Sequence, residues 1–124
     1  GYGGNAINQQ TYSQMDQYAH SENVTVVYPQ GLNYSWNVFT YWDSNPYDDV
    51  GFISAMISDI SENFNIDLDR VYACGMSNGG YMSYELICSL SDKITAFGSV
   101  TGNFMLNDNQ SCAVNNRNAG APRR

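Results

Sequence analysis

The stretch RVYACGMSNGGYMSYEL, residues 70–86, constrains the fold more than any other part of the chain. Its first five residues are largely apolar and predict a short buried strand over 70–74. A glycine-rich turn follows at once, and apolar residues at helical spacing then predict a helix over 77–90. The residues available for burial on that helix are Met82, Leu86, Ile87 and Leu90. A strand that passes through a tight turn into a helix is typical of parallel α/β folds.

The rest of the chain continues this alternation of helix and strand patterns. Apolar residues at helical spacing predict a helix over 8–23, and a β-branched run closed by proline and glycine predicts a buried strand over 24–31. The next segment, LNYSWNVFTYWDSNPYDD, is aromatic and turn-rich, which predicts a long loop. A helix is expected from Asp48, and a third strand over 94–100; the apolar face of that helix is Ile53, Met56, Ile57, Ile60 and Phe64. The predicted fold class is therefore α/β, with parallel strands joined by crossover helices.

Charge excludes two classes of partner. The 124 residues carry a formal net charge of −7 at pH 7, with a sequence pI near 4.2. Nucleic acid and anionic membrane surfaces would repel such a chain. No apolar run approaches the ~20 residues of a transmembrane helix, and the first ten residues lack the pattern of a signal peptide. One acidic domain that binds neither nucleic acid nor membrane is expected.

Ser77 is the candidate nucleophile, because it is the centre of a Gly-x-Ser-x-Gly pattern from Gly75 to Gly79. The pattern alone is weak, but here it follows a predicted strand and opens a predicted helix, the setting that exposes a serine hydroxyl on a sharp turn. Side chains at Gly75 and Gly79 are expected to clash where the backbone bends. The backbone N–H of Asn78 would face an oxyanion at the N-terminus of the helix.

Other interpretations of this turn stay open. A phosphate-binding loop is disfavoured, because neither Gly-x-Gly-x-x-Gly nor a Lys followed by Ser or Thr is present. Ser77 as an ordinary helix cap is the stronger alternative, since serine is a favoured N-cap. An oxyanion site also needs a second backbone donor, and the glycine loop GYGGNA at residues 1–6 is a candidate for it. A flexible terminus would have the same composition.

The three cysteines leave room for one disulfide. Cys74 lies in the apolar run and is expected in the core. Cys88, late in a predicted helix, and Cys112, in a polar segment, can pair if the protein matures in an oxidising compartment, but spacing leaves that pairing open. The spacing of cysteine and histidine fits no metal site, and no cofactor is expected.

Five segments together carry a resemblance to one family. GYGGNA, VVYPQG, SWN, DDVGFI and RVYACGMSNGGYMSYEL occur in the order and approximate spacing of the secreted esterase family that includes poly(3-hydroxybutyrate) depolymerases and feruloyl esterases, within the α/β-hydrolase superfamily. The resemblance covers residues 1–101 and implies part of a three-layer α/β-hydrolase catalytic domain. In that family His-Gly normally precedes the glycine loop, so the chain is expected to begin inside the motif. Residues 102–124 are expected to form a loop and a disordered tail.

The resemblance assigns roles around the turn. It implies that Ser77 is the nucleophile of a serine esterase and that Gly75 and Gly79 shape the elbow around it. It also implies that the backbone N–H groups of Tyr2 and Asn78 form the oxyanion hole. These roles require the glycine loop and the elbow to meet in space.

The resemblance also places the aromatic loop near the substrate. It implies that Trp36 and Asn37 lie near the substrate cleft and that Asp49 supports the active-site face. For Trp36 and Trp42, aromatic packing of the loop is an equally good interpretation. For Asp48 and Asp49, helix capping is preferred to catalysis.

The base and acid of a serine esterase do not appear at the expected places. In this superfamily the chain order is Ser, then acid, then His. The one histidine, His20, precedes Ser77 and is expected on the surface of the first helix. Asp108 could be proposed as the acid, but the family places its acid one strand later. The chain is therefore expected to be the central third of an esterase, close to inactive when taken alone.

The expected function is that of a secreted or periplasmic serine carboxylesterase. Its substrate would be a polymer or polymer-linked ester, either polyhydroxyalkanoate or a feruloylated or acetylated plant polysaccharide. The alternative is a non-catalytic module that binds polymer or glycan through exposed aromatic rings. The rings considered for that role are Tyr34, Trp36, Tyr41 and Trp42.

Overall fold

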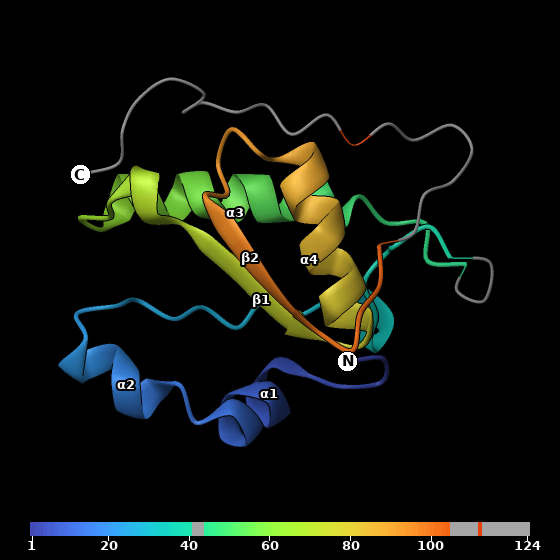
Figure 1. Ribbon diagram of the computed structural model, residues 1–124, viewed down its shortest axis with the longest axis horizontal. Coiled ribbons are helices and arrows are strands. Elements are labelled where there is room, and N and C mark those ends of the chain that lie inside the picture. The colour runs from blue at the N-terminus through green and yellow to red at the C-terminus, as the bar shows by residue number, and fades with distance from the viewer. Residues whose placement is uncertain (41–43, 105–111, 113–124) are drawn as a thin grey trace.

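The centre of the fold is a pair of parallel strands joined by a helix. The computed structural model of the protein describes residues 1–40, 44–104 and 112. β1 (Tyr72–Met76) and β2 (Ala96–Val100) are parallel and in register along their whole length. α4 (Asn78–Ser89) connects the two strands and contacts both (Figure 1). Helices with a parallel sheet agree with the predicted α/β class, and the three-layer arrangement stays a prediction.

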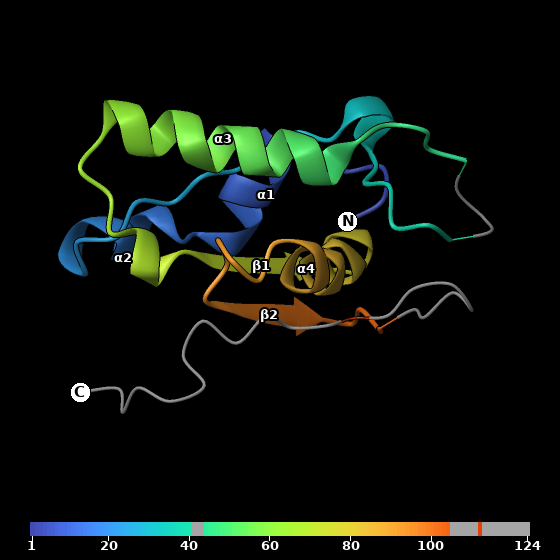
Figure 2. The same ribbon diagram turned by 90° about the horizontal axis from the view of Figure 1, so that it is seen from above.

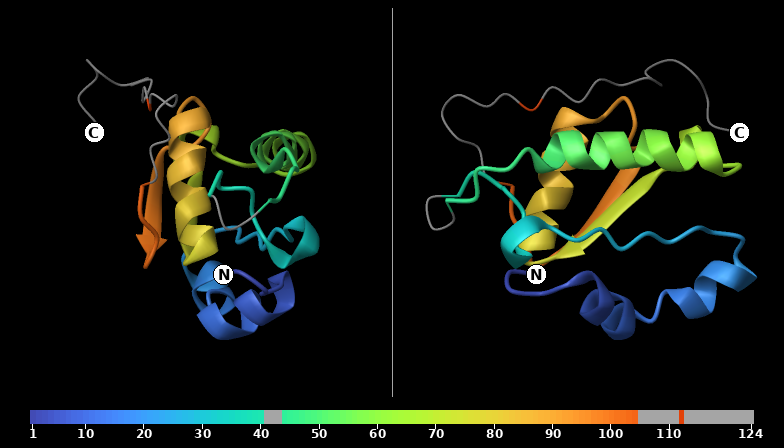
Figure 3. Two further views of the ribbon diagram at one scale, coloured as in Figure 1. Left: turned by 90° about the vertical axis from the view of Figure 1, so that its right-hand side faces the viewer. Right: turned by 180° about the vertical axis from the view of Figure 1, so that it is seen from behind.

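α4 and its C-cap residue Leu90 supply half of the buried apolar residues of the core. Its apolar face buries Met82, Leu86 and Leu90, as the spacing of these residues predicts. α3 (Asp49–Asn63) lies beside α4, on the side that faces away from β2 (Figures 2 and 3). The buried apolar residues are Val38, Ile53, Met82, Leu86, Leu90 and Ile94. This cluster fixes where α4 begins, and hence where Ser77 lies.

α3 begins where its capping signal predicts. The Asp48 side chain accepts a hydrogen bond of 2.8 Å from the backbone N–H of Gly51, which satisfies a donor that the first turn leaves free. Ile53 is buried, and Met56 and Ile57 pack against the core from the same face. The helix ends at Asn63, and the predicted face member Phe64 lies beyond it and is mostly exposed.

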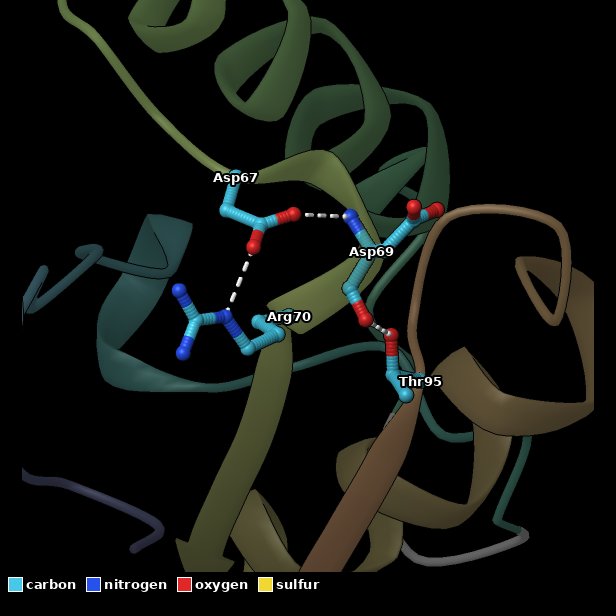
Figure 4. Close-up of polar contacts among 4 residues, drawn as sticks. All are labelled: Asp67, Asp69, Arg70 and Thr95. Atoms are coloured by element: carbon cyan, nitrogen blue, oxygen red, sulfur yellow. Dashed lines mark hydrogen bonds and ion pairs between the residues drawn. The ribbon is translucent and has the colours of Figure 1, made fainter. Parts of the chain in front are cut away.

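A short polar network fixes the start of both strands. Asp67 accepts hydrogen bonds from the Arg70 Nε, at 2.7 Å, and from the backbone N–H of Asp69, at 3.0 Å (Figure 4). The Thr95 hydroxyl donates to the Asp69 carbonyl at 2.8 Å, which ties this turn to the chain entering β2. The Arg70 guanidinium and then the Asp69 N–H hold the pKa of the Asp67 carboxyl below its usual value. The predicted strand start at Arg70 is wrong by two residues, because Arg70 completes the 3-10 turn η2 (Leu68–Arg70).

The predicted helix over 8–23 is two shorter helices. α1 (Ala6–Ser13) and α2 (Asp16–Ser21) are separated at Gln14, whose φ of 54° is left-handed and ends α1. Asn5 caps α1 by accepting from the Asn8 N–H at 2.8 Å. Neither helix buries a residue, so packing does not force them into one rod. Of the helices formed by the described residues, none has the length and apolar character needed to cross a membrane.

The predicted buried strand over 24–31 is wrong. The segment is not a strand, and Val24 and Val27 are 51% and 43% exposed. A strand needs a neighbour for its N–H and C=O groups, and within the described residues β1 and β2 pair only with each other. The segment instead fastens the first helices. Tyr28 donates its hydroxyl to Asp16 at 2.9 Å, and Gln30 accepts from the backbone N–H of Ala6 at 2.8 Å.

One face of the sheet is open to solvent in the described structure. Burial alternates along β1 and β2, and Tyr72 and Val100 remain 62% and 58% exposed. Cys74 lies on this face and is exposed, so its expected place in the core is wrong. The period of two sends alternate side chains to opposite faces, and α4 covers one face only. Cys88 of α4 forms a disulfide with Cys112, with a Cα–Cα distance of 4.9 Å.

Candidate active site

Ser77 lies on a strained turn between β1 and α4. Its φ is 54° and its ψ is −120°, a conformation that residues other than glycine rarely adopt. It occupies the N-cap position of α4, yet its side chain makes no capping hydrogen bond, and the residue is exposed. The helix-cap interpretation therefore leaves its hydroxyl unexplained. The backbone N–H of Ser77 donates to the Val100 carbonyl at 2.9 Å, which anchors the turn to the end of β2.

The glycines around Ser77 have different steric roles. A Cβ atom on Gly75 would overlap the Gly79 carbonyl and lie 2.9 Å from the Gly79 Cα, so Gly75 is required for β1 to meet α4. A Cβ on Gly79 itself would have no atom within 4 Å, so the expected clash at Gly79 is wrong. The tight approach lies one residue later. A Cβ on Gly80 would be 2.7 Å from the Ser99 Oγ and 3.0 Å from the Gly102 Cα.

The glycine loop at the N-terminus lies against the same turn. A Cβ built on Gly1 would be 3.6 Å from the Ser77 Cβ and 3.6 Å from the Met76 carbonyl oxygen. The N-terminus lies beside the start of α4 in every view (Figures 1 and 3). The Gly3 N–H donates to the Tyr34 carbonyl at 2.8 Å and holds the loop in place. The structure thus brings together the loop of Tyr2 and the turn of Ser77, as the oxyanion prediction requires.

Asn78 is joined to the aromatic loop by its side chain. Its Oδ1 accepts from the Trp36 backbone N–H at 2.7 Å, and its Nδ2 donates to the Trp36 carbonyl at 3.1 Å. The next backbone N–H, that of Asn37, donates to Asp49 at 2.6 Å. Asn78 and Asp49 are each 5% exposed, and each is the first residue of its helix. Asp49 therefore supports this loop from the first turn of α3.

The Trp36 ring packs on the interior. It stacks on Phe52 of α3 with a centroid distance of 6.5 Å and an interplanar angle of 17°. The ring also lies against the core cluster. Aromatic packing is therefore the better interpretation of Trp36. Trp42 and Tyr41 lie outside the described residues.

Asn37 lines a cavity that Ser77 does not line. Its Nδ2 donates to the Tyr47 carbonyl at 2.9 Å, and its Oδ1 accepts from the Phe39 N–H at 3.2 Å. The cavity beside it has a volume of about 230 Å³ and runs to the start of α3. The predicted cleft role of Asn37 has no support from this placement.

His20 lies far from Ser77. It is exposed, near the end of α2, and lines a cavity of about 480 Å³ between the first helices and residues 23–28. α2 and the start of α4 are well separated in two perpendicular views (Figures 1 and 2). The predicted surface position of His20 is confirmed. Asp108, the other residue weighed for the triad, lies outside the described residues.

Two features of the site have no local sequence signal. The Asn78 and Trp36 pairing joins residues 42 positions apart, and the close approach of Gly80 and Gly102 joins α4 to the chain after β2. For Asn78 and Trp36 the only sequence hint is that both lie in segments that resemble the family, whereas Gly102 lies just beyond the residues covered by that resemblance. In the part of the chain that the structure describes, no group of three or more His, Cys, Asp and Glu residues is arranged to hold a metal ion.

Comparison with known proteins gives relatives that are named as esterases. The chain is 33% identical over 94 residues to the bifunctional acetylxylan esterase/xylanase XynS20E of Neocallimastix patriciarum. This match covers 76% of this chain and 13% of that protein. It is 32% identical over 82 residues to feruloyl esterase D of Neurospora crassa, and this match covers 66% of this chain and 26% of that protein. It is 32% identical over 97 residues to feruloyl esterase B of Piromyces equi, and this match covers 75% of this chain and 18% of that protein. No protein-family model matches the chain.

The chain spans between 13% and 26% of the length of these three relatives. Within the chain, however, the similarity covers between 66% and 76% of the residues. Because these relatives are all named esterases, the comparisons support an esterase-like family for this chain.

Proposed function

We propose that this chain carries the nucleophile and the oxyanion hole of a serine carboxylesterase. The observation that carries the proposal is Ser77 itself: an exposed serine with φ of 54°, at a helix N-terminus that its hydroxyl does not cap. Strain of this kind costs about 1–3 kcal/mol and is concentrated at functional sites. The esterase names of the relatives support the same reading.

The neighbouring backbone supplies donors for the developing oxyanion. The first hydrogen bond of α4 runs from the Tyr81 N–H to the Ser77 carbonyl, so the N–H groups before it have no acceptor within the helix. The N–H of Asn78 is the nearest of these in sequence to Ser77. The N–H of Tyr2, from the glycine loop beside Ser77, is the second donor in this proposal.

In the reaction the Ser77 Oγ attacks the ester carbonyl carbon while a base removes its proton. The carbonyl oxygen takes the negative charge and is held by the N–H groups of Asn78 and Tyr2. When this tetrahedral intermediate collapses, the bond to the alcohol breaks and the alcohol leaves with the proton that the base removed. An acyl-serine remains. Water then releases the acid and returns the proton to Ser77. We expect the base outside the described residues, since His20 belongs to α2, which is well separated from the start of α4 (Figure 1).

The substrate in this proposal is an acetyl or feruloyl ester on plant polysaccharide. The names of the relatives motivate this choice. We also propose that the protein works outside the cell, where the disulfide of Cys88 and Cys112 would persist. Polyhydroxyalkanoate, the other polymer expected from the sequence, is the comparison substrate.

The test replaces Ser77 in the intact protein. Ser77→Ala is expected to lower kcat about 10³-fold or more on methyl ferulate or acetylated xylan, because the acyl-serine can no longer form. Ser89→Ala is the matched control, since this serine is exposed at the other end of α4, where its hydroxyl donates to the Glu85 carboxylate. Full activity in Ser77→Ala would refute the proposal. Hydrolysis of polyhydroxybutyrate but not of the polysaccharide esters would overturn the substrate class alone.

A non-catalytic polymer-binding module is the second function expected from the sequence. Its aromatic surface would include the Trp36 ring, but that ring stacks on Phe52 and packs on the core. Tyr34, 57% exposed, is the described ring that remains available. The structure therefore gives this alternative little support. Retention of inactive Ser77→Ala protein on insoluble xylan, lost in Tyr34→Ala, would favour it.

A further inference from the structure

The side chain of Asn78 acts as a clasp between the nucleophile turn and the aromatic loop. It uses both ends of its amide on one residue, accepting from the Trp36 N–H at 2.7 Å and donating to the Trp36 carbonyl at 3.1 Å. An aspartate could accept but not donate, and a serine is too short to span both atoms. The Asn78 side of the pair is shielded from water, since Asn78 is 5% exposed. A buried, doubly bonded amide is a rigid connection.

The other half of the clasp is itself immobilised. The Trp36 ring stacks on Phe52 of α3, and the Asn37 N–H donates to the buried carboxylate of Asp49 at 2.6 Å. The main chain at residues 36–37 is therefore fixed by the first turns of both α3 and α4. Movement of Asn78 relative to α3 would break either its two hydrogen bonds to Trp36 or both the Asn37–Asp49 hydrogen bond and the stacking of Trp36 on Phe52.

From this arrangement we propose that the Asn78 side chain is a positioning residue for the oxyanion hole. By clasping the Trp36 main chain it holds its own backbone N–H in line with the charge that develops next to Ser77. This inference rests on the esterase function proposed above. It assigns to the Asn78 side chain a task separate from that of its backbone N–H, which every residue type except proline could supply.

The physical need for such a clasp comes from the helix end. The N–H of Asn78 has no acceptor within α4, and the preceding residue is held in a strained conformation. A helix end without side-chain capping tends to fray, and Ser77 provides no capping bond. Oxyanion donors work only when they are already aimed at the transition state, and loss of one donor costs about 10²–10³ in kcat. When a donor is loosened and not removed, kcat should fall less, by about 10–100-fold.

The experiment compares Asn78→Ala and Asn78→Ser with wild type in the intact protein, using 4-nitrophenyl acetate as the probe. Both variants keep the backbone N–H and lose the two bonds to Trp36. We expect kcat to fall about 10–100-fold with KM changed less than about 3-fold, because the oxyanion forms only in the transition state. Asn63→Ala is the matched control, since the exposed Asn63 also bonds a main-chain carbonyl, that of Asp59, but lies at the far end of α3.

The outcomes separate this inference from the proposed function. If Ser77→Ala abolishes turnover and a folded Asn78 variant keeps the wild-type kcat, the clasp has no catalytic role and the inference is wrong. A loss confined to KM would also overturn it, because it would place the side chain in substrate binding. Full activity in Ser77→Ala would instead remove the proposed function on which the inference rests. Thermal melts identify folded variants, and the serine variant serves if the alanine variant does not fold.

Discussion

A pair of alanine substitutions, Gly75→Ala and Gly79→Ala, tests the geometry of the nucleophile turn. The two glycines are symmetric about Ser77 in the sequence, and motif reasoning gives both the same role. The structure separates them. A methyl group on Gly75 would overlap the main chain of Gly79 in the first turn of α4, whereas one on Gly79 would meet no atom within 4 Å. The expected effects on stability therefore have opposite signs.

The magnitudes follow from what each methyl group meets. Overpacking usually costs about 1–3 kcal/mol, and the upper end applies at Gly75 because the obstacle is backbone, not a flexible side chain. Gly79 lies within α4, where alanine is favoured over glycine by about 0.5 kcal/mol or more. The variants should differ by about 3.5 kcal/mol in the free energy of unfolding, or about 400-fold in the folding equilibrium.

Urea unfolding of the intact protein, followed by circular dichroism, measures this difference. The slope of the unfolding free energy against urea concentration should be the same for wild type and both variants. A shift of the midpoint then reports stability alone. If Gly79→Ala destabilises as much as Gly75→Ala, the geometry of the turn is wrong. If Gly75→Ala stays within about 0.5 kcal/mol of wild type, the close approach of β1 and α4 does not exist, since overpacking should cost at least about 1 kcal/mol.

Two further predictions concern the disulfide and the turn before β1. Cys88 and Cys112 are 24 residues apart, so replacing both with alanine should cost about 3.5 kcal/mol through the unfolded chain; equal urea midpoints for the oxidised wild type and the double variant would contradict this. Asp67 has a lowered pKa in the folded state, so its contribution to stability is present above its unfolded pKa and is lost as pH falls through the lower folded value. The stability advantage of wild type over Asp67→Asn at pH 7 should therefore shrink below about pH 4, and a pH-independent difference would rule out the ion pair as its source.

The parts of the fold that local signals specify were predictable from the sequence. The start of α3 follows from Asp48 as a cap, and the buried face of α4 follows from the spacing of Met82 and Leu86. β2 lies within the predicted range because its apolar run is bounded by polar turn residues. Each of these signals acts within one turn or one strand, so a single sequence contains it.

The errors arise where structure depends on a distant neighbour. Residues 24–31 have the composition of a strand, but a strand forms only against a partner, which composition does not describe. Cys74 was expected in the core because an apolar run suggests two covered faces, and α4 covers only one. The break at Gln14 has the same origin, since neither α1 nor α2 buries a residue that would hold the two helices in line.

The candidate site shows the same division. The exposed turn at Ser77 and its meeting with the glycine loop follow from motif and resemblance. The clasp between Asn78 and Trp36 does not, because it joins side chain to main chain across 42 residues. A main-chain partner leaves no trace in residue identity at position 36, since every residue offers a carbonyl and all but proline an N–H.

The strained backbone at Ser77 sets two selective pressures against each other. With φ at 54°, a glycine at this position would relieve strain of about 1–3 kcal/mol and leave the turn unchanged. Selection for folding alone therefore favours glycine at position 77. On the proposed function, selection for turnover favours the hydroxyl that glycine lacks. In a gene copy that is no longer selected for activity, replacing Ser77 by glycine would increase stability. Position 77 should therefore be among the first to change in such a copy.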